Sequence, residues 1–200
     1  MKLDTTFLDE VSDFREGHGV ATDKTVTSFK KVYDLVKPKK VIEIGFNAGH
    51  SAFIGLSICD TIEKYVSVDI GKHKYTRTNA NKMIDLFPNT FVYKEIDSKK
   101  LSHSKVSKEG YDLAFIDGDH SLKGLTADID TMAKAKIPYI LIDDFDRENF
   151  THIVKYVHSI ENTAKFPYTT VFEIEYDSYT SMLPEVLVPA GAILMKRHNA

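Results

Sequence analysis

The hydrophobic positions change their spacing along the chain, and each spacing predicts a type of element. Near the N-terminus they recur three or four residues apart, which is typical of amphipathic helices. The two sets are Phe7, Leu8, Val11 and Phe14, and then Val26, Phe29, Tyr33 and Val36. Residues 16–19 interrupt the pattern between them, and the charged and proline positions of 37–39 end the second helix. We therefore expect two helices within residues 1–38.

After residue 38, short apolar runs alternate with helical patterns. We predict strands at 41–44, 65–69, 90–95, 111–116 and 139–142, and helices at 52–58, 122–132 and 150–157. Unbroken apolar runs such as those at 113–116 and 140–142 are typical of strands buried on both faces. The pattern therefore predicts a parallel sheet covered by helices on both sides.

The C-terminal part has a different pattern. Phe172, Ile174 and Tyr176 alternate with two glutamates, which indicates a half-exposed strand, and a last apolar run follows at 192–195. We interpret this as an antiparallel pair at one edge of the sheet. Because no repeat or linker divides the chain, we expect one α/β domain over residues 1–200. It would combine a helical cap (1–38) with a doubly wound, mostly parallel seven-stranded core (39–200).

Composition narrows the class of protein. The chain has 200 residues, 42% of them hydrophobic, which suits one compact domain. Its net charge of -3 gives no general attraction to nucleic acid, and its single cysteine excludes an internal disulfide. The longest uncharged apolar stretch, 186–195, is far short of the roughly 20 residues that span a bilayer, and the charged N-terminus does not resemble a signal peptide. We expect a soluble cytoplasmic protein with no membrane partner.

A glycine-punctuated turn follows the first predicted strand of the core. Gly45 and Gly49 lie between that strand and an apolar helix, an arrangement that suits a nucleotide-like ligand. Their G-x-x-x-G spacing differs from the G-x-G-x-x-G of dinucleotide sites. Glu43, inside the strand, would repel a phosphate but would suit a ligand with a cationic amine. We therefore predict a ligand other than a dinucleotide.

Acidic residues also follow the next two strands. Asp69 ends the second strand, where a carboxylate is placed to accept hydrogen bonds from ribose hydroxyls. Asp97 and Ser98 follow the third strand, where a carboxylate suits the adenine amine. The alternative for both acids is an ordinary solvated carboxylate at a strand end.

Two acids follow each of the fourth and fifth strands: Asp117 with Asp119, and Asp143 with Asp144. Four carboxylates in one crevice would repel one another and raise one another's pKa values. A divalent cation relieves this repulsion, and oxygen ligands favour Mg²⁺, Mn²⁺ or Ca²⁺ over zinc. Alternatively, some of these acids cap the helices that follow, Asp119 together with Ser121 being one example.

Taken together, four motifs resemble those of class I S-adenosylmethionine-dependent methyltransferases. They are V-I-E-I-G-F-N-A-G-H-S, V-S-V-D-I, F-I-D-G-D-H-S and I-L-I-D-D-F, within residues 40–145. The closest resemblance is to the metal-dependent O-methyltransferases, which include the catechol, caffeoyl-coenzyme-A and macrocin-type sugar enzymes and their cephalosporin-hydroxylase relatives. The resemblance implies a Rossmann-like fold, S-adenosyl-L-methionine as the methyl donor and a hydroxyl on a small molecule, sugar or natural-product intermediate as the acceptor.

The resemblance also assigns roles to individual residues. The residues expected to bind the cofactor are Glu43, Gly45, Asn47, Gly49, Ser51, Asp69, Asp97, Ser98 and Asp117, and those expected to bind the metal are Asp117, Asp143 and Asp144. A metal lowers the pKa of a bound hydroxyl, and a nearby base then removes the proton. Asp119 is the first candidate for the base by analogy with the sugar enzymes. His120 is the second, because the ordinary pKa of histidine is near neutral, although it would serve equally as a residue packed on the following helix.

Several features separate this chain from parts of the family. Asp144 stands where catechol-type enzymes carry asparagine, which favours the sugar enzymes, and residues 134–138 replace a Gly-Gly turn. The fourth strand is not followed by the Asn/Asp-Pro-Pro-Tyr motif of amine-methylating nucleic-acid enzymes. Residues 16–23 are expected to form either a cofactor lid or an ordinary loop. Residues 176–189 are expected to line an acceptor pocket, form a contact in a homo-oligomer, or remain a surface loop.

Three other functions fit parts of the pattern. A metal-independent class I methyltransferase would use Asp69 and the glycines but would not need Asp143 and Asp144. A nicotinamide oxidoreductase shares the sheet, but the missing third glycine and Glu43 argue against it. A non-catalytic cofactor-binding protein would keep the fold without the chemistry, because one scaffold supports many functions.

Overall fold

The computed structural model describes residues 3–11, 19–146, 148–179 and 187–200. Its strands are β1 (Lys40–Ile44), β2 (Lys64–Asp69), β3 (Phe91–Glu95), β4 (Leu113–Ile116), β5 (Tyr139–Ile142), β6 (Tyr168–Tyr179) and β7 (Leu187–Arg197). Its helices are α1 (Thr6–Asp9), α2 (Asp23–Val36), α3 (His50–Ile58), α4 (Lys74–Leu86), the 3₁₀ turn η1 (Ser98–Lys100), α5 (His103–Glu109), α6 (Leu122–Lys134) and α7 (Thr151–Ile160). Within these ranges, no helix is both long and apolar enough to cross a membrane.

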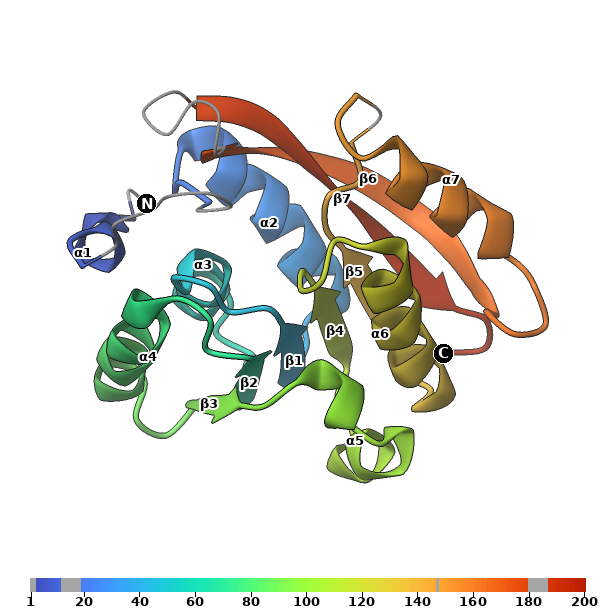
Figure 1. Ribbon diagram of the computed structural model, residues 1–200, viewed down its shortest axis with the longest axis horizontal. Helices are drawn as coiled ribbons and strands as arrows, with labels where there is room; N and C mark the ends of the chain where they lie inside the picture. The colour runs from blue at the N-terminus through green and yellow to red at the C-terminus, as the bar shows by residue number, and fades with distance from the viewer. Residues whose placement is uncertain (1–2, 12–18, 147, 180–186) are drawn as a thin grey trace.

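The strands form one seven-stranded sheet in the order β3-β2-β1-β4-β5-β7-β6 (Figure 1). Strands β1 to β5 are parallel, and β7 runs antiparallel to both β5 and β6. This confirms the predicted mostly parallel sheet with an antiparallel edge pair. The strand order reverses between β1 and β4, and ligands of such sheets bind beyond the carboxyl ends of the strands at that reversal.

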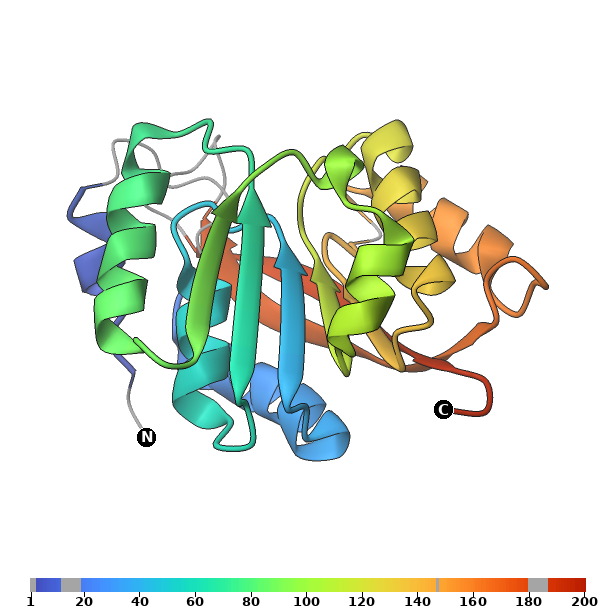
Figure 2. The same ribbon diagram turned by 90° about the horizontal axis from the view of Figure 1, so that it is seen from below.

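Helices cover both faces of the sheet (Figure 2). Ile42 and Ile44 of β1 belong to a core shared with α5, α6 and α7, whereas Val41 belongs to a core shared with α1 to α4. Successive side chains of a strand point to opposite faces, so a strand between two layers of helices must be apolar at nearly every position. Glu43, which points to the same side as Val41, is the fully buried polar exception in β1.

The structure also contains elements that the hydrophobic pattern did not predict. Helices α4 and α5 were missed because α5 buries only Val106, and the buried side of α4 carries polar residues such as Asn79. The first helix is shorter than expected: α1 ends at Asp9, and the Phe14 end of the predicted helix lies outside the described residues. The antiparallel strands are longer than predicted, pairing from Tyr168 to Tyr179.

The beginning of α2 covers part of the outer edge of β6. The Val20 amide donates to the Asp177 carbonyl at 3.1 Å, and the Asp177 amide donates to the Thr25 hydroxyl at 3.1 Å. The Ser28 hydroxyl donates to the Glu175 carbonyl at 2.5 Å. These bonds satisfy backbone groups that an edge strand would otherwise expose, and they fix α2 against the sheet.

Candidate functional site

The loop between β1 and α3 needs both of its glycines. Gly45 and Gly49 each have a φ of 92°, a conformation that residues with a side chain rarely adopt. A Cβ atom at Gly45 would lie 1.8 Å from the Asp117 carbonyl oxygen, and one at Gly49 would lie 2.5 Å from the Phe46 ring. The loop therefore packs directly against the end of β4. At Gly49 the close approach is made by the Phe46 ring.

Asp69, at the end of β2, holds this loop. Its Oδ2 accepts hydrogen bonds from the amides of Phe46 at 2.8 Å and Asn47 at 3.0 Å. Its Oδ1 accepts from the Gly71 amide at 2.7 Å. A carboxylate has about four acceptor positions, so Asp69 keeps capacity for a further donor such as a ribose hydroxyl.

Glu43 is fully buried, with no exposed surface. Its Oε1 accepts from the Ser51 hydroxyl at 2.5 Å and from the Tyr65 hydroxyl at 3.1 Å, and its Oε2 accepts from the Ser67 hydroxyl. Burial raises the pKa of Glu43 to about 7, although these hydrogen bonds act in the opposite direction. Ser51, which donates to Glu43, is the member of this network that lines the cleft described below.

A cleft of about 410 Å³, including space open to solvent, joins the glycine loop to the ends of β4 and β5. It is lined by Gly19, Thr25, Phe29, Phe46 to Ser51, Ile54, Phe115, Asp117, Asp143 and Tyr176. Five of the predicted site residues, namely Asn47, Gly49, Ser51, Asp117 and Asp143, thus share one cleft. Gly19 pairs with Ser178 beside it, so both predicted loops reach this region, although residues 16–18 and 180–186 lie outside the described ranges.

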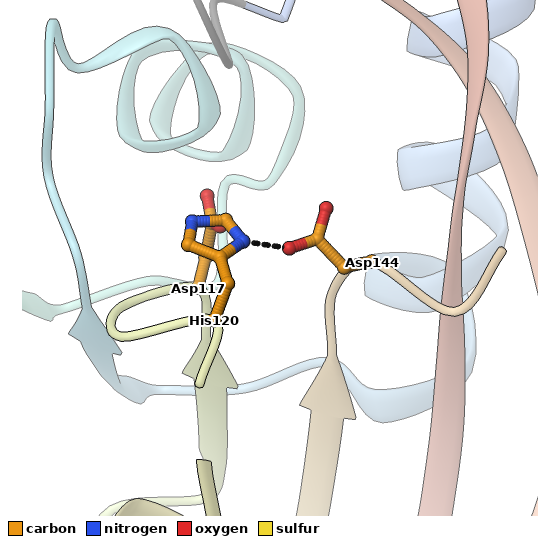
Figure 3. A group of neighbouring side chains, drawn as sticks. All are labelled: Asp117, His120 and Asp144. Carbon is orange, nitrogen blue, oxygen red and sulfur yellow. Dashed lines mark hydrogen bonds and ion pairs between the residues drawn. The ribbon is translucent and has the colours of Figure 1, made fainter. Parts of the chain in front are cut away.

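Two acids and a histidine converge at the ends of β4 and β5 (Figure 3). Asp117 and His120 follow β4, Asp144 follows β5, and one potential ligand atom from each lies within 4.8 Å of the others. His120 Nδ1 contacts the Asp144 carboxylate directly. Burial raises the pKa of Asp117 well above its usual range, and the charges of Asp143 and Asp144 add to this.

Asp143 lies beside this group, where its side chain hydrogen-bonds Asp117. Its Oδ1 accepts a hydrogen bond from the Tyr176 hydroxyl at 2.5 Å, and burial raises its pKa to about 7. The three potential ligand atoms that meet here belong to Asp117, His120 and Asp144, and Asp143, also a predicted ligand, hydrogen-bonds Asp117 and Tyr176 beside them.

Sequence comparison identifies the family to which the chain belongs. The chain matches the methyltransferase domain over residues 42–145, a range that holds both the glycine loop and the acidic group. The chain belongs to this methyltransferase family. The predicted class, an S-adenosylmethionine-dependent methyltransferase, is supported at that level, and no curated protein has a significantly similar sequence.

Solved structures show the same fold. An O-methyltransferase from Bacillus cereus in complex with SAH matches with a TM-score of 0.63 and 13% identity, covering 98% of this chain and 92% of its own. A candidate caffeoyl-CoA O-methyltransferase from Staphylococcus aureus matches at 0.61 and 16%, covering 88% and 85%. A candidate RNA methyltransferase from Pyrococcus horikoshii matches at 0.59 and 11%, covering 88% and 81%. At these identities the likeness shows the fold and leaves the methyl acceptor undefined.

In this methyltransferase, Asp119 lies two residues before Ser121, the residue that caps α6. Its Oδ1 accepts from the Ser121 amide at 3.0 Å, and its Oδ2 accepts from Lys99 Nζ at 3.2 Å. The hydrogen bonds with Ser121, and then Lys99, lower the pKa of Asp119. Ser121 itself caps α6 by accepting from the Gly124 amide at 3.1 Å. Asp119 thus holds the amide of the capping residue, and a carboxylate of lowered pKa is a weak general base.

The loop after β3 contains Asp97 and Ser98 and rests on a residue that the sequence did not single out. Asp97 accepts from the Lys99 amide at 3.0 Å and opens the turn η1. Ser98 hydrogen-bonds Asp128, a buried residue of α6 whose pKa burial raises to about 6. Asp128 lies on the same helix face as Leu125 and Met132. An acidic residue within that apolar stripe was the feature of the sequence that could have indicated its role.

Proposed function

We propose that this methyltransferase methylates a hydroxyl of a small molecule, sugar or natural-product intermediate with the help of a divalent cation. The observation that carries the proposal is the convergence of Asp117, His120 and Asp144 beside the cleft. A hydroxyl is a weak nucleophile until its proton is removed, so O-methylation benefits from a cation and a base next to the methyl donor. The net charge of -3 favours such an acceptor over nucleic acid.

The donor groups present fit a divalent cation. Carboxylate oxygens such as those of Asp117 and Asp144 suit Mg²⁺, Mn²⁺ and Ca²⁺. The raised pKa of Asp117 supports the proposal, because its main cause, burial beside other carboxylates, is a cost that a bound cation offsets. Asp117 and Asp144 would hold the ion, which when bound would lower the pKa of the acceptor hydroxyl.

His120 is the proposed base. Its Nδ1 contacts Asp144, and a carboxylate in that position orients the ring and stabilises its protonated form. Nε2 is then the ring nitrogen that takes the hydroxyl proton. The oxygen bonds the methyl carbon as the sulfonium C–S bond breaks, and S-adenosylhomocysteine is released. This assignment places His120 ahead of Asp119, whose pKa is lowered and whose carboxylate is engaged by Lys99.

The test is a panel of hydroxylated acceptors, including amino sugars, sugars and phenols, in which S-adenosylhomocysteine release is measured. We expect at least one acceptor to be turned over, activity to disappear with chelator, and Mn²⁺ or Mg²⁺ to restore it. Turnover that resists the chelator would contradict the cation. Cofactor binding without turnover of any acceptor would instead favour a non-catalytic cofactor-binding protein.

A second candidate is metal-independent methylation by the same residues. The observation in its favour is the direct contact between His120 and Asp144, because a carboxylate–imidazole pair is a competent base without a metal. Under this alternative, activity would resist the chelator but would still depend on His120. His120→Asn should abolish turnover if His120 is the base of a metal-independent reaction, and should leave turnover unchanged if the reaction needs no base.

A further inference from the structure

Helix α4 presents two buried hydrogen-bond donors to the glycine loop. Tyr75 and Asn79 lie one turn apart and therefore on the same side of the helix. The Tyr75 hydroxyl donates to Asn47 Oδ1 at 2.6 Å, and Asn79 Nδ2 donates to the Ala48 carbonyl at 3.1 Å. Tyr75 is 2% exposed and Asn79 is fully buried. Two neighbouring loop residues are thus held by two neighbouring positions of α4.

The same loop is held from β2. The Asp69 carboxylate accepts from the amides of Phe46 and Asn47, so β2 binds the N–H groups of the loop while α4 binds its oxygen atoms. Asn47 has a φ of 48°, in the left-handed region that asparagine tolerates better than most residues. The loop conformation therefore depends on partners on both sides.

Asn79 also ties the N-terminal segment to this unit. Its Nδ2 donates to the Leu8 carbonyl at 2.7 Å as well as to Ala48. One turn further along α4, Lys82 donates to the Phe7 carbonyl at 2.5 Å. Positions 75, 79 and 82 form one face, and each position on it donates to an acceptor outside α4. This accounts for a helix face that carries polar side chains where apolar ones are usual.

We propose that Tyr75 and Asn79 are positioning residues that hold the loop Phe46–Ala48 in the shape that binds S-adenosylmethionine. The inference rests on the assignment of this loop to the cofactor and is independent of the metal and of the acceptor. A loop already fixed in its binding conformation loses little entropy when the ligand arrives. Once the loop samples other conformations, the apparent affinity falls in proportion to the competent fraction.

The experiment compares Tyr75→Phe with Tyr168→Phe. Tyr168 is equally buried, and its hydroxyl donates to the Ile137 carbonyl at the same 2.6 Å, away from the cleft-lining residues. Calorimetric titration with S-adenosylhomocysteine in metal-free buffer is the readout, and melting temperature is measured beside it. We expect similar losses of melting temperature, a five- to tenfold weaker affinity in Tyr75→Phe, and unchanged affinity in Tyr168→Phe. Wild-type affinity in Tyr75→Phe, or equal weakening in both variants, overturns the proposal.

A double variant tests whether Tyr75 affects cofactor affinity through the Asn47 side chain. Because Tyr75 acts through the Asn47 side chain, Tyr75→Phe should add less than twofold to the loss caused by Asn47→Ala. Full additivity of the two losses overturns that route. This titration contains no metal, so its result does not depend on whether a metal binds. The metal proposal is tested separately, by the chelator and by the aspartate variants.

Discussion

The polar groups in the two halves of the cleft have different surroundings. On the glycine-loop side, Glu43 and Asp69 are surrounded by hydroxyl and amide donors from the chain itself. On the β4–β5 side, Asp117, Asp143 and Asp144 lie near one another, and burial and mutual repulsion raise the pKa values of Asp117 and Asp143. The acids of the first half thus already have hydrogen-bond partners within the chain. The second half concentrates carboxyl groups that disfavour one another's ionised forms, and a bound cation would offset this.

The largest effect expected from this difference is on catalysis. Asp144→Asn removes one charge from the β4–β5 side and the partner that orients His120. We expect turnover to fall by on the order of a thousandfold, while S-adenosylhomocysteine affinity stays within twofold. Steady-state kinetics and calorimetry measure the two quantities. The matched control is Asp130→Asn, which removes an exposed acid of α6 that pairs with Lys134, and it should change neither. A parallel loss of cofactor affinity in Asp144→Asn would erase the distinction between the two halves.

The next effect is a pH dependence of stability that originates on the glycine-loop side. The pKa of Glu43 is raised to about 7 from an ordinary value of 4.5, so the folded state binds a proton that the unfolded state releases. The free energy of unfolding should therefore fall as pH rises from about 4.5 to about 7, by on the order of 3 kcal/mol from this group. Glu43→Gln cannot titrate and should lose that part of the slope.

Urea unfolding of both proteins at pH 5 and pH 8 measures this slope. Asp128 and Asp143, whose pKa values are also raised, are present in both proteins, so the difference between the slopes isolates Glu43. Identical slopes would show that Glu43 stays ionised in the folded protein.

A smaller effect is expected at Asp69. Asp69→Asn keeps the size of the side chain but replaces one acceptor oxygen with an amide donor facing the loop. S-adenosylhomocysteine affinity should fall by about ten- to thirtyfold, because the loop amides lose a charged partner and the ribose loses an acceptor. Calorimetry provides the affinity. The same titration with Asp85→Asn, which changes an acid of α4 beyond the cleft lining, is the control and should match wild type.

The smallest effect is expected at Lys99. Its ammonium pairs with Asp119 at 3.2 Å on an exposed surface, and such pairs contribute little to stability. If Asp119 serves only to begin α6, Lys99→Ala should change turnover by less than twofold at pH 7. A large change in turnover or in its pH profile would restore Asp119 as the base.

Sequence alone predicted the sheet well, because strands buried between two layers of helices must be apolar at nearly every position. It failed at α4, where Asn79 occupies a buried position to serve Ala48 and Leu8, so the apolar stripe is incomplete. The polar residue that α4 uses to contact the glycine loop therefore interrupts the apolar pattern by which the helix could have been predicted.

The composition of the acidic group was equally hidden. Nothing within the run Asp143-Asp144 says that His120 contacts Asp144 while Tyr176 hydrogen-bonds Asp143. Tyr176 approaches from β6, more than thirty residues later in the chain. The predicted acids were therefore located at the correct strand ends, but their grouping needed the three-dimensional structure.

The most direct test of the difference between the two halves is a calorimetric titration of chelator-treated protein with Mn²⁺, for wild type and Asp144→Asn side by side. We predict micromolar binding by wild type, at least tenfold weaker binding by the variant, and equal S-adenosylhomocysteine affinity in both. Absence of Mn²⁺ binding to wild type, or unchanged binding in Asp144→Asn, would contradict the account of a preformed cofactor side beside a side that requires a cation.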